Sequence, residues 1–338
     1  MYRNVFKYDD MKRAEHMAVR ETVGWYLWTH QLMQVEGEDA QAFLELLFPN
    51  KISTLAVGRD RYTTMLDESG EIIDDVVVMR FEDHYWVSTL FASYMDDWFY
   101  EHQGDFNVDY YEVTDEWHMF AIQGPRSADV LNSMCAEPVD GLKFFQHAPN
   151  YIEGMQVIVN RGGFTGEKLG FELYCSADDA DAVEELLRKT AAGFGGRQVT
   201  EFQVMAWTLP TEAGFYYMRD LRHTNPYEVG LDAGIDWDKE FVGKKALQKV
   251  RDEGPSREML GFVVEEDDVF IQAKQYGGPG QAVMVDNEEV GRVSKLVYSY
   301  VKDINCGYIL ARKGVFGVGD EIEIHGHKVK ICERNWLD

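Results

Sequence analysis

The chain has 338 residues, of which 45% are hydrophobic and 13% aromatic, and its 33 basic and 59 acidic residues give a formal net charge of −26. This apolar content suffices for a packed core, which excludes a disordered chain, and the length predicts two or three domains. The negative charge disfavours binding to nucleic acid and to anionic membranes. No segment reaches the roughly 20 apolar residues of a membrane span. Residues 1–20 lack an apolar signal core and the four cysteines form no CxxC pair, so a cytoplasmic location without a metal site is expected.

Hydrophobic spacing predicts irregularly alternating helices and strands, which is typical of the α+β class. The predicted helices are residues 39–48, 91–102 and 176–190, and the predicted strands in the first third of the chain are residues 71–80 and 85–90. Residues 251–256 are polar and contain a Gly-Pro break, so they predict a domain boundary. The short, glycine-punctuated strands that follow predict a small β-barrel or sandwich.

Two adjacent acidic residues, Asp74 and Asp75, interrupt the apolar strand predicted over residues 71–80. Acidic residues are poor strand formers, and the alternation of a strand places Asp75 on the face of Val77 and Met79, with Asp74 on the opposite face. At least one carboxylate is therefore expected near a core, where burial raises its pKa and suits it to proton transfer. A strand end with both carboxylates in solvent is the plainer interpretation of the same pattern.

Glycine is concentrated in residues 161–170, ahead of a predicted strand that carries Glu172. The spacing matches neither a Walker A loop nor the dinucleotide-binding GxGxxG pattern. Glycines allow tight turns or the close approach of a ligand. A carboxylate beside such an opening can accept two parallel hydrogen bonds from an aminopyrimidine edge. The alternative is an ordinary glycine-rich hairpin with an exposed glutamate.

Aromatic residues cluster in residues 25–28, shortly before His30. Such clusters usually belong to a core, but they also form walls for a flat ligand. In the second case His30 would serve as an acid–base group, and in the first it is a structural hydrogen-bonding residue. The sequence patterns of serine hydrolases and zinc peptidases are absent, and the basic aromatic stretch 214–223 is too short for a nucleic-acid surface.

Several short motifs follow one another across nearly the whole chain. They read IIDD at residues 72–75, AIQGP at 121–125, RGGFTGE at 161–167 with GFE at 170–172, EAG at 212–214, NPYE at 225–228 and FVGKKAL at 241–247. Tyr62-Thr63, ahead of the first motif, fits the same pattern. In this order the motifs resemble the family of the glycine-cleavage T-protein (aminomethyltransferase), which includes tetrahydrofolate-dependent methyltransferases and demethylases.

The resemblance implies an α+β fold of three domains around a central folate pocket, with a β-rich C-terminal barrel. The implied domains are residues 1–48 with 118–146 and 215–254, residues 49–117 with 147–214, and residues 255–338. The resemblance also implies an enzyme that uses tetrahydrofolate as the one-carbon acceptor, with Glu172 as the pterin anchor and Asp75 as the acid near the reactive folate nitrogen. The other expected site residues are His30 and Tyr26 for catalysis, Arg161, Tyr62, Phe164, Thr165 and Gly166 for the cofactor, and Trp28, Arg219 and Arg222 for the substrate.

Some positions depart from the family pattern. Residues 25–31 replace an FDVSHM segment, Pro210 stands in place of an arginine, residues 87–90 differ, and one extra residue separates Glu167 from Gly170. Because the implied folate-anchoring positions are kept while those near the donor change, we expect the same acceptor and a different donor.

The first hypothesis is therefore a demethylase that moves a methyl group from a small O- or N-methylated compound, such as a methoxylated aromatic, to N5 of tetrahydrofolate. One alternative is a glycine-cleavage aminomethyltransferase, which forms 5,10-methylenetetrahydrofolate and needs a lipoyl carrier protein as its partner. The other is a non-catalytic folate-binding protein of the same fold.

Overall fold

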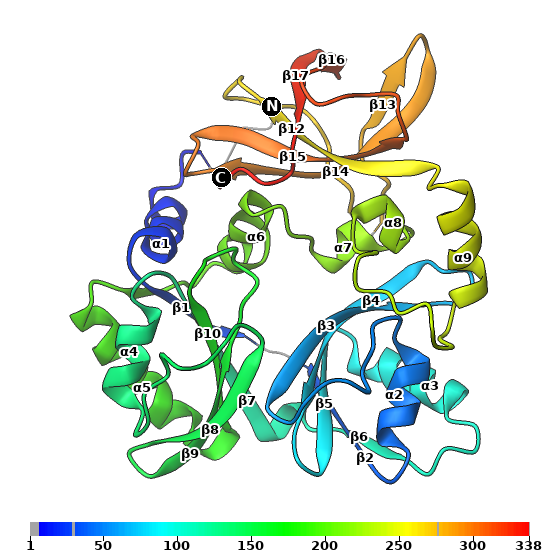
Figure 1. The fold of residues 1–338 in the computed structure, drawn as a ribbon. Coiled ribbons are helices and arrows are strands. Elements are labelled where there is room, and N and C mark those ends of the chain that lie inside the picture. The colour runs from blue at the N-terminus through cyan, green and yellow to red at the C-terminus, as the bar shows by residue number, and fades with distance from the viewer. Residues whose placement is uncertain (1–6, 29–30, 276, 338) are drawn as a thin grey trace.

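The computed structural model describes residues 7–28, 31–275 and 277–337. An 11-stranded sheet organises the first two thirds of the chain. Its first half consists, in order, of β11 (Arg197–Gln198), β1 (Gly24–Trp28), β7 (Trp117–Gln123), β10 (Gly170–Ser176), β9 (Met155–Arg161) and β8 (Gln146–Ile152). The second half continues with β3 (Arg59–Leu66), β4 (Ile72–Arg80), β5 (His84–Thr89), β2 (Gln31–Glu36) and β6 (Asp109–Glu112). Figure 1 shows the two halves facing each other across the middle of the molecule.

Helices cover the outer face of each half. On the outer side of the first half, at the left of the view, lie α4 (Ser127–Met134) and α5 (Ala180–Gly193). On the outer side of the second half, at the right, lie α2 (Ala40–Leu47) and α3 (Ala92–His102) (Figure 1). The buried side of α2 consists of Ala40, Phe43, Leu44 and Leu47, the spacing from which a helix was expected. The hydroxyl of Ser176 accepts a hydrogen bond from the Asp179 amide, so Ser176 caps the 3₁₀ turn η2 (Ala177–Asp179) that leads into α5.

Residues of the C-terminal third form a six-stranded antiparallel sheet. Its order is β13 (Ala282–Val285), β14 (Glu288–Ser299), β15 (Ile304–Arg312), β12 (Arg257–Val264), β17 (His327–Cys332) and β16 (Glu321–Ile324). This barrel-like sheet joins α9 (Lys244–Glu253) through residues 254–256, where a boundary was predicted. The α+β fold with a β-rich C-terminal module is thereby confirmed.

Short helical segments fill the space between the two sheets. They are α1 (Asp10–Glu21), the π-helical turn η3 (Val204–Thr208), α6 (Leu209–Glu212), α7 (Met218–Leu221) and α8 (Pro226–Val229). Elsewhere, the 3₁₀ turn η1 (Thr114–Glu116) precedes β7. Figure 1 shows α6, α7 and α8 directly beneath the C-terminal sheet and above the opening between the two halves. Among the described residues, no helix is long and apolar enough to cross a membrane.

The sheet groups the strands differently from the predicted domain division. That division joined residues 147–214 to residues 49–117, whereas β8, β9 and β10 continue the half that contains β1 and β7. It also kept residues 1–48 together, although β1 and β2 lie in different halves. Hydrophobic periodicity predicts where strands occur but not which strands pair. Strand order alone does not define domain boundaries, so the three predicted sets of boundaries stay a prediction.

Candidate functional site

The two carboxylates of the acidic doublet on β4 face opposite sides of the sheet. Val76, on the side of Asp74, packs in the core beneath α2 and α3. Val77, on the side of Asp75, packs against the apolar cluster on the inner face, between the two halves. The alternation expected for a strand is confirmed, and it directs the second carboxylate of the doublet toward the centre of the molecule.

The inner carboxylate, Asp75, is paired with a phenol. Tyr62, on the neighbouring strand β3, donates a hydrogen bond of 2.9 Å to Oδ2 of Asp75. Burial raises the pKa of Asp75 to about 6, the hydrogen bond from Tyr62 opposes the rise, and the charge of Asp220 adds to it. A carboxyl group that titrates near neutrality is suited to general acid–base catalysis.

The outer carboxylate, Asp74, is 2% exposed and has a structural environment. The Thr89 hydroxyl donates a hydrogen bond to its Oδ2, and the same hydroxyl accepts one from the Phe91 amide at 3.0 Å. Burial, followed by the charge of Asp75, raises the pKa of Asp74 to about 7. Asp74 thus ties β4 to the end of β5 and to the segment that enters α3.

A row of polar side chains crosses the inner face from β10 to β3. The strand register places Glu172 opposite Asn160, and Asn160 opposite His147. Nδ2 of Asn160 donates to Oε2 of Glu172 at 3.0 Å, and Nδ1 of His147 lies 2.5 Å from Oδ1 of Asp60. Because neighbouring strands are only about 4.7–4.9 Å apart, these four residues form one continuous polar row.

Glu172 is the carboxylate of this row that the sequence motifs identify as the expected ligand-binding residue. Burial raises its pKa to about 7, the hydrogen bond from Asn160 lowers it, and the charge of Asp60 raises it. Tyr174 donates a further hydrogen bond of 3.2 Å to Oε2. Oδ1 of Asn160 and Oδ2 of Asp60 are buried without a hydrogen-bond partner among the residues that the structure describes. Unpaired buried acceptors are costly, so this row suits a ligand edge that presents N–H donors.

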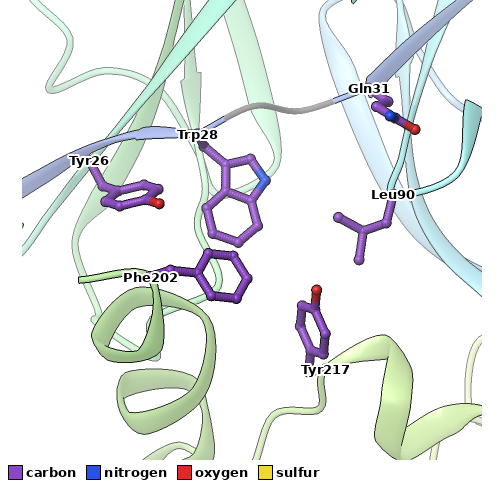
Figure 2. Close-up of a pocket in the computed structure, with 6 residues that line it drawn as sticks. All are labelled: Tyr26, Trp28, Gln31, Leu90, Phe202 and Tyr217. Carbon is purple, nitrogen blue, oxygen red and sulfur yellow. The ribbon is translucent and has the colours of Figure 1, made fainter. Parts of the chain in front are cut away.

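A cavity of about 240 Å³ opens at the junction of the two halves. Its lining residues are Tyr26, Trp28, Gln31, Leu90, Phe202 and Tyr217 (Figure 2). The rings of Trp28 and Phe202 are stacked with their centroids 5.6 Å apart, and Phe164 packs against Trp28 at 4.7 Å. Figure 2 shows the phenol oxygen of Tyr217 pointing toward the space between Trp28 and Leu90. Aromatic walls of this kind suit a flat ligand.

Both interpretations of the aromatic cluster therefore apply, to different residues. Trp25 is fully buried in the core beneath α4 and α5, whereas Tyr26 and Trp28 line the cavity. His30, predicted as a catalytic residue, lies outside the described residues.

The glycine-rich hairpin between β9 and β10 wraps around Gln123, at the end of β7. Nε2 of Gln123 donates to the carbonyl oxygens of Gly162 and Phe171 at 3.0 and 3.1 Å, and the buried Thr165 hydroxyl donates to its Oε1 at 2.8 Å. Gly163 has φ +150°, and a Cβ atom there would lie 2.2 Å from Oε1 of Gln123. Two of the sequence motifs, AIQGP and RGGFTGE, are thus halves of one packing arrangement.

The other predicted site residues lie in several places. Gly166 packs against Ala213 of the EAG motif. The guanidinium of Arg161 donates to the Leu142 carbonyl at 2.7 Å. Arg219 and Arg222 lie on and just after α7, beneath the C-terminal sheet. The binding roles expected for these residues and for Phe164 and Thr165 stay predictions.

The sequence analysis missed three of the four residues of the polar row and four of the six residues that line the 240 Å³ cavity, which we call the aromatic cavity. The missed residues are Asp60, His147, Asn160, Gln31, Leu90, Phe202 and Tyr217. One available signal was Asp60, an acidic residue inside a strand. Its partner His147 is 87 residues away in sequence, and only the order of the strands brings the two together.

Comparisons with known proteins give similarities that cover most of the chain. The sequence model of a family, described as GCVT N-terminal domain, matches residues 1–239. An aminomethyltransferase from Bacillus pumilus is 31% identical over 333 residues, which are 94% of this chain and 87% of that protein. One from Thermotoga petrophila is 30% identical over 331 residues, 94% of this chain and 86% of that protein.

Among solved structures, the fold is similar to that of the glycine cleavage system aminomethyltransferase T from Bartonella henselae. The TM-score is 0.85, with 96% of this chain and 89% of that chain covered at 21% identity.

Proposed function

The chain belongs to the aminomethyltransferase family of the glycine-cleavage T-protein, and from this premise we propose that it transfers an aminomethyl-derived one-carbon unit to tetrahydrofolate, forming 5,10-methylenetetrahydrofolate. As a member of this family it is a folate-dependent one-carbon transferase, with tetrahydrofolate as the acceptor. A lipoyl carrier protein would present the aminomethyl group. The observation that carries the proposal is that the Asp75–Tyr62 pair and the row containing Glu172 lie on the same inner face of one sheet.

The demethylase, which was the first hypothesis from the sequence, becomes the second candidate. The relatives that match 94% of the chain bear the name aminomethyltransferase. The change at Pro210 and the aromatic replacements in residues 25–31 indicated a different donor, but they do not outweigh this similarity.

The polar row fits a reduced pterin. The buried carboxylate of Glu172 and the unpaired Oδ1 of Asn160 match the N–H groups along a pterin edge, because carboxylates accept parallel hydrogen bonds from such groups. Glu172 would hold this edge, and Asn160 would orient the carboxylate through its own amide. Tetrahydrofolate, when bound, supplies a nucleophilic nitrogen for the one-carbon unit.

Asp75 would donate the proton that the leaving amine requires, and Tyr62 would orient Asp75. With a pKa of about 6, the Asp75 carboxyl is protonated in part of the molecules near neutral pH and can donate this proton to the departing group. Tyr62 holds Oδ2 and thereby fixes the orientation of the carboxyl group. The apolar cluster around Val77 and Met79 limits access of water, which strengthens electrostatic interactions within the site.

A product assay tests the proposal. The protein is incubated with tetrahydrofolate and a lipoyl carrier protein loaded with an aminomethyl group. The carbon's bonds to the lipoyl sulfur and to the amine nitrogen break as its bonds to N5 and N10 of tetrahydrofolate form. We therefore expect 5,10-methylenetetrahydrofolate, ammonia and the free dihydrolipoyl carrier protein in equal amounts. The absence of these products, with folate bound, contradicts the proposed activity.

One observation favours the second candidate, transfer of a methyl group from a small methylated aromatic. The stacked rings of Trp28 and Phe202 form a wall that suits an aromatic donor. A panel of O- and N-methylated compounds, assayed for 5-methyltetrahydrofolate, decides between the two. Phe202→Leu should reduce turnover of a methylated aromatic and leave aminomethyl transfer unchanged.

A further inference from the structure

Asp60 and His147 form a buried pair where the two halves of the 11-stranded sheet meet. Asp60 lies on β3 and His147 on β8, which are neighbours in the order of the strands. Asp60 is 5% exposed and His147 4% exposed, and Nδ1 of His147 lies 2.5 Å from Oδ1 of Asp60. The steps of the proposed transfer reaction use neither side chain.

Backbone hydrogen bonds and an aromatic ring hold this pair in place. The Asp60 amide donates to the Phe145 carbonyl at 3.1 Å, and the His147 amide donates to the Gly58 carbonyl at 3.0 Å. The ring of Phe81 packs against the ring of His147 with their centroids 4.4 Å apart. Because His147 holds Oδ1 of Asp60, the position of the second carboxylate oxygen is fixed as well.

This second oxygen, Oδ2 of Asp60, is buried and has no hydrogen-bond partner in the parts of the chain that the structure describes. Burial raises the pKa of Asp60, whereas the hydrogen bond and the charge of His147 lower it and so favour the ionised form. An ionised carboxylate only accepts hydrogen bonds, and leaving a buried acceptor unpaired is unfavourable. A ligand that brings an N–H group to Oδ2 would remove this cost.

Asp60 lies between the expected folate anchor and the expected acid. It precedes Tyr62 by two residues on β3, so the two side chains share the inner face of the sheet, and Tyr62 donates to Asp75 on β4. On the other side, the charge of Asp60 raises the pKa of Glu172, so the two carboxylates are also close. In the order of the strands, β3 lies between β10, which carries Glu172, and β4. A ligand that reaches from Glu172 to Asp75 therefore passes Asp60.

We propose that Oδ2 of Asp60 accepts a hydrogen bond from N8 of a reduced pterin and thereby makes the site selective for reduced over fully oxidised folate. This inference rests on the proposed function and adds Asp60 as a specificity-determining residue, with His147 as the residue that positions it. In a tetrahydropterin N5 and N8 both carry hydrogen, whereas in the oxidised ring both carry only a lone pair. Because N5 receives the one-carbon unit, N8 is the nitrogen that remains to donate. A lone pair at N8 would face the Oδ2 lone pairs, and sites built to bind an N–H group reject a ligand that lacks it.

The test compares the equilibrium dissociation constants of tetrahydrofolate, 7,8-dihydrofolate and folic acid, which carry the same tail, for the full chain. The measurements are made at pH 8, above the pKa of about 7 of Glu172. Dihydrofolate carries hydrogen at N8 but none at N5, so it separates the effect of N8 from that of full reduction. We expect tetrahydrofolate and dihydrofolate to bind at least roughly tenfold more tightly than folic acid. Dihydrofolate that binds as weakly as folic acid overturns the inference.

Asp60→Asn tests the oxygen itself. His147 keeps the amide oxygen as its acceptor, so the amide NH₂ group takes the place of Oδ2 and offers a donor where the wild-type protein offers an acceptor. Folic acid should then bind more tightly than to the wild-type protein and dihydrofolate less tightly, so their ratio of affinities should change roughly tenfold or more. The ratio cancels the effect of Asp60 on Glu172, which both folates share. A gain in folic acid affinity cannot arise from a misfolded protein.

Asp60→Ala removes the acceptor without adding a donor, and it should bring the affinities for dihydrofolate and folic acid closer together. Glu266→Gln is the matched control, because it neutralises a carboxylate that also contacts a histidine, His327, at 2.6 Å, but beside β17. It should keep the wild-type ratio. An unchanged ratio in both Asp60 variants overturns the inference, and so does an equal change in Glu266→Gln. Failure of the wild-type protein to bind any of the three folates would instead contradict the proposed function.

Discussion

Tyr62 and Asp75, thirteen residues apart in sequence, are joined by a hydrogen bond of 2.9 Å between the phenol and the carboxylate Oδ2. They lie on adjacent antiparallel strands and face the opening between the two halves of the sheet. The phenol donates to Oδ2, one of the two carboxylate oxygens of Asp75. This pair is the part of the site that we expect to move a proton, and Glu172 is the part that we expect to bind.

Removing the acid should separate catalysis from binding. Asp75→Asn keeps the size of the side chain but cannot donate a carboxyl proton, so kcat should fall roughly 10²- to 10⁴-fold, the usual contribution of a general acid. The dissociation constant of tetrahydrofolate should stay within about twofold, because Glu172 is untouched. Asp83→Asn, at an exposed turn residue, is the control. Unchanged turnover in Asp75→Asn would show that another group protonates the leaving amine.

Tyr62→Phe should move the pH dependence of the reaction. The hydrogen bond from Tyr62 stabilises the ionised form of Asp75, so its loss raises the pKa of Asp75 above the present value of about 6. The protonated carboxyl is the proposed active form, so kcat of the wild-type protein, measured at saturating tetrahydrofolate, should fall as the pH rises through about 6. In Tyr62→Phe this fall should occur at higher pH. Tyr151→Phe, at an exposed tyrosine, should leave the profile in place, and a shift to lower pH in Tyr62→Phe would refute the assigned role.

Folate affinity should depend on the ionisation of Glu172. The ionised carboxylate accepts hydrogen bonds, so affinity should be lost as the pH falls through the pKa of about 7. Glu172→Ala should weaken binding by about 1.5–3 kcal/mol at pH 8, the range for hydrogen bonds to a charged group. Glu172→Gln should abolish the pH dependence as well. Titration of the protein with tetrahydrofolate between pH 5.5 and 8.5 measures both effects, and a Glu185→Gln variant, at an exposed helix position, serves as the control.

Asp60, which contacts His147 at the far end of the polar row, should influence the pH at which folate affinity is lost. The negative charge of Asp60 raises the pKa of Glu172, so Asp60→Asn should lower that pKa and shift the loss of affinity to lower pH. The matched control is His327→Gln, which breaks a histidine–carboxylate contact of 2.6 Å with Glu266 in the C-terminal sheet. A midpoint that stays in place in Asp60→Asn means that the two carboxylates do not interact.

The sequence predicted the parts of the site that depend on neighbours in the chain. The period of two along β4 was enough to place Asp75 and Asp74 on opposite faces. The motif that contains Glu172 was found because its glycines lie next to it in sequence. The contact of His147 with Asp60 depends instead on how β8 meets β3, where the register records a single opposed pair, Arg59 and Gln146. No local sequence pattern predicts that β8 and β3 pair.

The same reasoning applies to the order of the strands in the sheet and to the aromatic cavity, which no local sequence pattern predicts. The pairing of β8, β9 and β10 with β7 is a choice among strands of similar composition, and hydrophobic periodicity does not decide it. Phe202 and Tyr217 reach the aromatic cavity from segments around η3 and α7, far from Trp28 in sequence. Aromatic residues in such segments look like ordinary core residues until the chain is folded.

Glu212 should be among the most important residues for stability, because it joins three parts of the fold. This fully buried carboxylate accepts hydrogen bonds from His16 at 2.8 Å and from Arg20 at 2.9 and 3.1 Å, both on α1, and from Ser299 on β14 at 2.6 Å. Burial alone would raise the pKa of Glu212, but the hydrogen bond and charge of His16 and the charge of Arg20 hold it at about 2.

Glu212→Ala should destabilise the protein by about 3–5 kcal/mol, since it leaves the buried Arg20 without this partner. The lowered pKa also fixes the sign of the pH dependence. The stabilisation is present above the ordinary glutamate pKa of about 4.3 and is lost as the pH falls from there toward 2. Denaturant unfolding between pH 3 and 7 should therefore give a smaller difference between wild type and Glu212→Gln at pH 3 than at pH 7. A difference that grows on acidification would mean that Glu212 is not ionised in the folded protein.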